Sequence, residues 1–148
     1  MKMDRSQEGF TLVEVLIVVS VLLVIIVGSI FLGGSQFAKR QIDGEAEEML
    51  SVLRRAQARS VSGYVSDVWG VHIQTSEYTL FLGSDWPARD TTYDEVHVLP
   101  ASMTALGISE VHFIIGTGET PDYGTITLTQ DSESSTITVS ESGLITMP

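Results

Sequence analysis

Residues 8–32 read EGFTLVEVLIVVSVLLVIIVGSIFL, an almost wholly apolar run with one carboxylate beyond Phe10, that of Glu14. A helix from Phe10 to Leu32 rises about 34 Å, enough to cross the hydrocarbon core of a bilayer. The run is too long for an ordinary secretory signal peptide, and helices in soluble cores are seldom apolar on every face. It therefore predicts a transmembrane helix over residues 10–32.

The position of Glu14 requires an explanation of its own. A carboxylate inside a membrane-spanning segment costs a few kcal/mol, so such a residue usually serves a function. A plain signal anchor, with Lys2 and Arg5 holding the N-terminus in the cytoplasm, leaves Glu14 unexplained.

The polar leader MKMDRSQE (residues 1–8), followed by GFTLVEVLIVV (residues 9–19), resembles the N-terminal signature of type IV pilin-like proteins. In that family a membrane prepilin peptidase cuts after the glycine and methylates the new N-terminus. The resemblance implies cleavage between Gly9 and Phe10 and N-methylation of Phe10. It also implies that Glu14 is the family's membrane-embedded glutamate.

Elementary electrostatics supplies a role for Glu14 in such a protein. Cleavage would create a cationic amine on Phe10, and Glu14 lies one helical turn further along the same face. Opposite charges attract strongly in a low dielectric, whereas either charge alone is costly to bury. The pair can form within one subunit or between neighbours; between neighbours it would set the axial register of a filament.

Residues 33–62 are predicted to continue the helix in amphipathic form. After the glycines at 33 and 34, apolar residues recur at helical spacing, and Ser62-Gly63 ends the pattern. The apolar positions are Ile42, Ala46, Met49, Leu53 and Ala56. Arg54, Arg55 and Arg59 are expected on a solvated face together with nearby glutamates.

Beyond residue 63 the apolar period changes to two, which predicts short strands. The seven predicted strands span residues 67–74, 77–83, 94–100, 109–116, 124–131, 135–142 and 143–148. Together with the helix they predict an α+β fold: a long N-terminal helix packed on an antiparallel β-rich globular domain. The predicted parts are a leader (1–9), a membrane or filament-core helix (10–32), its amphipathic continuation (33–62) and the β-rich domain (63–148). Residues 83–94 are expected to form an irregular loop that is mobile or contacts a partner.

The order of segments in this body resembles the GspH/FimT branch of the pilin-like family, which comprises minor pseudopilins and minor pilins. The resemblance rests on LRRAQARS (53–60), WGVHI (69–73), YTLFL (78–82), VHFIIGTGE (111–119) and ITVSESGLI (137–145).

Composition excludes several other classes of protein. The net charge is −11 and no lysine or arginine follows Arg89, so binding of nucleic acid is not expected. The absence of cysteine excludes disulfides and thiolate chemistry. No nucleophile elbow or phosphate-binding loop is present, so we expect neither an enzyme nor a cofactor.

Three histidines, His72, His97 and His112, each follow a valine in a predicted strand. Alternation predicts that all three lie opposite the apolar face of their strands. They could form a zinc site if those strands were neighbours, but their separations match no short metal motif. We expect solvent-facing side chains and no metal site.

The expected function is that of a minor pseudopilin in a type II secretion system. It would be a single-pass protein of the inner membrane, with a cytoplasmic N-terminus before cleavage and an extracytoplasmic globular domain. Prepilin peptidase, the assembly platform and other pseudopilins or pilins are the expected partners, and a periplasmic pseudopilus that helps drive protein export is the expected assembly. The alternatives are a minor pilin of a type IV pilus, serving assembly, adhesion or DNA uptake, and a single-pass anchored domain that binds a ligand.

Overall fold

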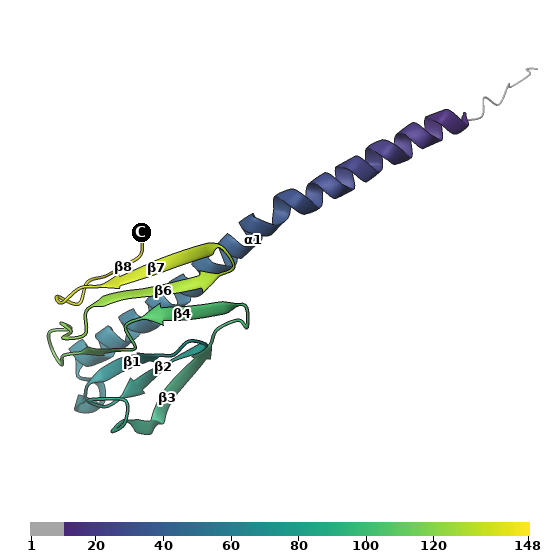
Figure 1. Cartoon of the computed structure of the whole chain (residues 1–148). Helices are drawn as coiled ribbons and strands as arrows, with labels where there is room; N and C mark the ends of the chain where they lie inside the picture. The colour runs from purple at the N-terminus through teal and green to yellow at the C-terminus, as the bar shows by residue number, and fades with distance from the viewer. Residues whose placement is uncertain (1–10) are drawn as a thin grey trace, which may run out of the picture. The chain divides into compact units, whose positions relative to one another are not determined.

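The computed structural model describes residues 11–148, apart from the side chains of residues 29–36 and 66. Its contacts divide the chain into two compact units, Met1–Gln36 and Phe37–Pro148. One helix, α1 (Leu12–Ser62), precedes a short 3-10 turn, η1 (Tyr64–Ser66), and eight strands (Figure 1). The strands are β1 (Trp69–Ile73), β2 (Glu77–Leu82), β3 (Asp90–Val98), β4 (Met103–Gly107), β5 (Glu110–Phe113), β6 (Gly124–Gln130), β7 (Glu133–Val139) and β8 (Ile145–Thr146).

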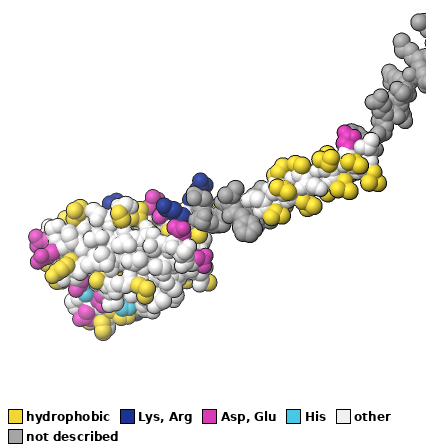
Figure 2. Space-filling view, turned by 45° about the horizontal axis from the view of Figure 1, so that its top comes forward, with side chains coloured by type: hydrophobic (Ala, Val, Ile, Leu, Met, Phe, Trp, Pro, Cys, Tyr) yellow, Lys and Arg dark blue, Asp and Glu magenta, His cyan; other side chains and the backbone are white. Residues whose placement is uncertain are grey.

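In the first unit, the face of α1 that Figure 2 shows is lined with apolar side chains. The large hydrophobic side chains from Leu12 to Val27 are 49–80% exposed. Among the residues that the structure describes, no helical stretch is both long and apolar enough to cross a membrane. The predicted span over residues 10–32 stays a prediction.

The strands of the second unit form two four-stranded antiparallel sheets. The first sheet has the order β3-β2-β1-β5 and the second the order β4-β6-β7-β8. In the first sheet, His72 on β1 pairs with Thr79 on β2 and with Glu110 on β5. These registers place the three side chains on one face of the sheet, opposite Val71.

One hydrophobic core joins α1 to the two sheets. The predicted helical stripe Ile42, Ala46, Met49, Leu53 and Ala56 is fully buried, which confirms the amphipathic prediction. The stripe packs in the same cluster as apolar residues of both sheets. Burying one such large side chain contributes about 1.5–3 kcal/mol. Among the residues that the structure describes, the buried core residues lie between Ile42 and Ile145, all within the second unit.

The helix ends where the chain turns back toward the first sheet. Gly63 has a φ of 66°, a left-handed conformation that glycine adopts without a Cβ clash. Buried Ser60 then ties the helix end to β1, because its hydroxyl accepts the Trp69 N–H at 2.9 Å. The Trp69 indole N–H donates to the Tyr64 carbonyl at 3.0 Å.

The α+β prediction is confirmed, although three strand predictions were wrong in detail. Strand β4 was not predicted, because Ala105 and Gly107 give it little β propensity. Strand β3 begins at Asp90, so the predicted irregular loop over residues 83–94 ends at Arg89. The final strand covers only Ile145–Thr146.

Candidate functional site

The described part of the N-terminal motif begins with a capped helix. The Glu14 backbone N–H donates to Thr11 Oγ1 at 3.3 Å, and the Val15 N–H donates to the Thr11 carbonyl at 3.2 Å. A threonine at the N-cap followed three residues later by glutamate is the spacing of a capping box. Sequence reasoning missed the capping role of Thr11, although this T-x-x-E pattern signals it.

Glu14 therefore lies in the first turn of α1. A negative side chain there interacts favourably with the partial positive charge of the helix N-terminus. Gly9 and Phe10, the predicted cleavage and methylation site, lie outside the described residues. The predicted pairing between Glu14 and an amine on Phe10 stays a prediction.

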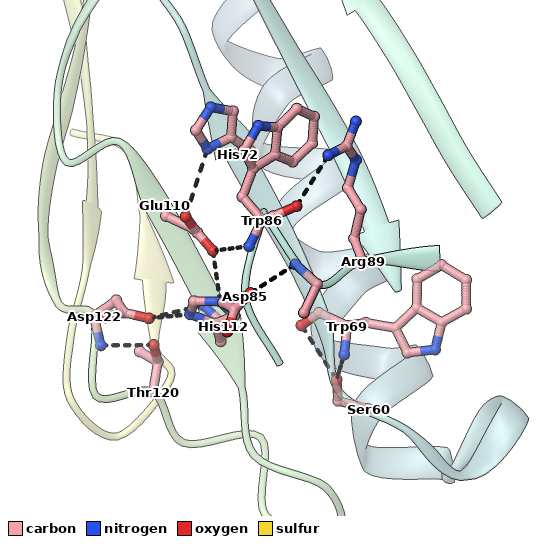
Figure 3. Close-up of polar contacts among 11 residues, drawn as sticks. Ser60, Trp69, His72, Asp85, Trp86, Arg89, Glu110, His112, Thr120 and Asp122 are labelled. Carbon is pink, nitrogen blue, oxygen red and sulfur yellow. Dashed lines mark hydrogen bonds and ion pairs between the residues drawn. The ribbon is translucent and has the colours of Figure 1, made fainter. Parts of the chain in front are cut away.

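A polar cluster occupies the outer face of the first sheet, the face away from α1 (Figure 3). At its centre is Glu110 on β5, whose Oε1 accepts the Trp86 backbone N–H at 2.8 Å. The same Oε1 lies 2.7 Å from His112 Nε2, without hydrogen-bond alignment, and Oε2 lies 3.6 Å from His72 Nδ1. Asp122 contacts the other ring nitrogen of His112 at 2.5 Å. One carboxylate thus connects two strands to the loop that carries Trp86.

The loop over residues 83–89 is fixed to the sheet by a stack of three planar groups. The Trp86 indole stacks on the His72 imidazole with ring centroids 4.1 Å apart and planes 10° from parallel. The Arg89 guanidinium carbon lies 3.5 Å from the centroid of the indole, and Arg89 Nε donates to Asp94 Oδ2 at 2.9 Å. Aromatic stacking and cation–π contacts each contribute about 0.5–2 kcal/mol. No feature of the sequence indicated this packing.

His97 lies on the inner face of the sheet, toward α1, so the expectation that its side chain faces solvent was wrong. Strand β3 pairs His97 with Tyr78, and the two rings stack with centroids 5.0 Å apart. His97 Nδ1 lies 3.1 Å from Glu48 Oε1 on α1. Val96 and Val98 are the exposed residues here, at 56% and 73%. In this edge strand the apolar side chains therefore face solvent, and the polar His97 packs against α1.

The glutamates of α1 beside His97 change the acidity of two groups. Burial, together with the Glu48 carboxylate, raises the pKa of Glu45, and His97 opposes this rise. Burial also raises the pKa of Tyr78, to which Glu48 and Glu45 add. Both shifts favour the uncharged forms of these groups at the helix–sheet contact.

No metal centre is formed by the residues that the structure describes. Within residues 11–148, no group of three histidine or acidic side chains is arranged to hold a metal ion. His72 and His112 lie on neighbouring strands and share Glu110, but His97 is separated from both by β2 and faces α1.

Three arginines near the end of α1, Arg54, Arg55 and Arg59, contact other residues of the second unit. Arg55 and Arg59 contact the two oxygens of Glu95 at 3.0 and 2.8 Å, and Arg59 also lies over the Trp69 ring. The expected pairing with glutamates of the helix itself was wrong, because the carboxylate that Arg55 and Arg59 contact is that of Glu95 on β3. Arg54 donates to the Ile145 carbonyl at 3.5 Å.

Comparison with known proteins gives two matches, one to a sequence motif and one to a fold. The profile of the prokaryotic N-terminal methylation motif matches residues 4–33. The structure of the minor pseudopilin EpsH from the type 2 secretion system of Vibrio cholerae is similar with a TM-score of 0.57 and 14% sequence identity. The similarity covers 73% of this chain and 96% of that chain. No curated protein sequence matches significantly.

The chain thus combines a prokaryotic N-terminal methylation motif with an α+β fold that is similar to that of a minor pseudopilin.

Proposed function

We propose that the chain is a minor pseudopilin of a type II secretion system. The observation that carries this proposal is the combination of a methylation motif at residues 4–33 with the fold of a minor pseudopilin over 73% of the chain. In this role the protein is a structural subunit and not an enzyme. It joins a periplasmic pseudopilus that helps drive protein export.

The exposed apolar part of α1 that lies in the first unit supports a role in membrane insertion and filament packing. Residues 12–28 would span about 25 Å as a helix, and their large apolar side chains are half or more exposed. A continuous apolar surface of this size needs lipid or other helices around it. We propose that the segment first spans the inner membrane and then packs among the helices of other pseudopilins.

Glu14 would direct this second step. Prepilin peptidase would cut between Gly9 and Phe10 and methylate Phe10, which leaves a cationic amine near the Glu14 carboxylate. Compensation of the two charges between neighbouring subunits would favour incorporation at one axial register. The assembly platform of the inner membrane would then extract the subunit into the filament.

The experiment that tests this function is the substitution Gly9→Val in the full chain, expressed with a prepilin peptidase. The expected result is a full-length, unprocessed chain in the membrane that does not enter filaments. Filament incorporation of the uncleaved variant would overturn the proposal.

A minor pilin of a type IV pilus is the second candidate, because the same motif serves both kinds of filament. The charge of the body argues against a pilin that takes up DNA, since no basic residue follows Arg89. Loss of protein secretion, with normal surface pili, on deletion of the gene would favour the pseudopilin; the opposite pattern would favour the pilin.

A further inference from the structure

An apolar pocket opens at the end of the body where α1 stops. Its volume is about 350 Å³, and its apolar lining consists of Val68, Phe113, Ile114, Ile115 and Pro121. The turn after β5 lies beside the helix end, because the Gly116 N–H donates to the Ser60 carbonyl at 3.2 Å. Ile114 and Ile115 remain 46% and 43% exposed. The described chain therefore leaves this pocket uncovered.

The polar cluster fixes one wall of the pocket. Ser84, from the loop held by Trp86, and His112, held by Glu110 and Asp122, both line it. Because these contacts hold the pocket in shape, little conformational entropy is lost when a side chain binds in it.

Several acidic residues are close in sequence to the residues that line the pocket. Asp67, Asp85, Glu119 and Asp122 each lie one or two positions from a lining residue, and no lysine or arginine does. An apolar pocket with acidic neighbours favours an apolar side chain that is flanked by basic residues.

The chain itself carries an apolar side chain flanked by basic residues, at the other end of the second unit. Phe37 is 74% exposed, and Lys39 and Arg40 follow it on the exposed surface of α1. Within residues 37–148, the four arginines beyond Arg40 bond to Glu95, Asp94 or the Ile145 carbonyl, whereas Lys39 and Arg40 form no ion pair.

The two features cannot meet within one molecule. Phe37 and Ser60 are 23 residues apart on α1, which corresponds to about 35 Å along a helix. A contact between the Phe37 segment and the pocket must therefore join two copies head to tail. Such a heterologous contact repeats into a ring or an open helical filament.

We propose that Phe37–Arg40 of one copy docks in the pocket of a second copy, with Phe37 among the apolar lining residues and the basic side chains near the acidic ones. This axial contact between globular bodies rests on the proposed filament role and adds to the packing of the N-terminal helices.

The test uses a fragment of residues 33–148, which contains every core residue in the described part of the chain. The chain has no cysteine, so two single-cysteine variants, Gly44→Cys and Ser84→Cys, can be mixed and treated with a short bis-maleimide. Gly44 lies one turn after Arg40, where an added Cβ would meet no atom within 4 Å, and Ser84 lines the pocket. The expected product is a covalent heterodimer, in greater yield than from Gly44→Cys mixed with the control variant Thr138→Cys on the second sheet.

Two further substitutions test the chemistry of the contact. Phe37→Ser should lower the yield at least about tenfold, because it removes the buried aromatic group. Lys39→Glu should also lower the yield, and Glu119→Lys on the pocket copy should restore it.

A heterodimer yield no higher than that of the Thr138→Cys control would overturn the proposal, as would a yield that Phe37→Ser and Lys39→Glu leave unchanged. Cleavage after Gly9 in the full chain is measured separately. Failure of the cross-link with normal cleavage would overturn this contact alone, whereas failure of cleavage would overturn the proposed function.

Discussion

The Glu14 backbone N–H donates to Thr11 Oγ1 at 3.3 Å, so the first turn of α1 is held by the residue three positions before Glu14. The bond uses the backbone of Glu14 and leaves its carboxylate available for a partner. Capping and charge can therefore be separated by substitution.

We predict that Glu14→Gln, which removes the charge and keeps the backbone bond, leaves cleavage and membrane insertion intact but strongly reduces incorporation into filaments. Thr11→Ala is the matched control, because it removes the cap at a cost of about 1 kcal/mol to the helix start and retains the carboxylate. Subunit content of purified filaments measures the outcome. Normal incorporation of Glu14→Gln would contradict the charge-pairing role.

A pair of glycine substitutions tests the packing of the body. A Cβ on Gly70 would lie 2.8 Å from Phe81 Cζ and 2.9 Å from the Val111 carbonyl oxygen, whereas a Cβ on Gly44 meets no atom within 4 Å. We expect Gly70→Ala to destabilise the body by about 1–3 kcal/mol. Gly44→Ala should stabilise it by about 0.5–1 kcal/mol, because alanine is the better helix former. Urea denaturation of residues 33–148 measures both, and equal midpoints would contradict the described packing.

The stack on Trp86 gives a third prediction. Trp86→Ala should lower the free energy of unfolding by about 1–3 kcal/mol, because it removes the contacts to His72 and Arg89 together. Trp86→Phe, which retains a ring, should cost less. If Trp86→Ala had the stability of the unsubstituted body, the loop over residues 83–89 would not be fixed as described.

The raised pKa of Glu45 predicts a dependence of stability on pH. Because the folded chain binds this proton more tightly than the unfolded chain, the group favours folding below its ordinary pKa of 4.5. That contribution is lost as the pH rises through the higher folded pKa. Glu45→Gln should therefore stabilise the body at pH 7 by a few tenths of a kcal/mol, since solvent screens this partly exposed group.

The gain from Glu45→Gln should disappear near pH 4, and Glu47→Gln on the exposed face of the same helix serves as the control. Thermal denaturation at the two pH values measures the difference. A stabilisation of equal size at both pH values would show that the charge of Glu45 is not its cause.

The helix and the fold class could be predicted because their signals are local. The stripe from Ile42 to Ala56 follows the helical period, and the strand alternation from Trp69 onward follows the period of two. Those periods depend only on backbone geometry, so the buried face follows from the sequence without knowledge of its partner.

The polar cluster could not be predicted because its contacts depend on strand order. His72 meets Glu110 only because β1 pairs with β5, 38 positions further along the chain. The side of His97 was mispredicted for a related reason: its partners, Glu48 and Tyr78, belong to elements whose placement the local pattern does not contain.

The most direct test of the central claim is the mass of the N-terminal peptide of the full chain, recovered from membranes of cells with an active prepilin peptidase. Cleavage of an established prepilin in the same cells provides the control. We predict a peptide that begins at Phe10 and carries one added methyl group on its amine. A peptide that retains residues 1–9, or one that begins elsewhere, would contradict the account.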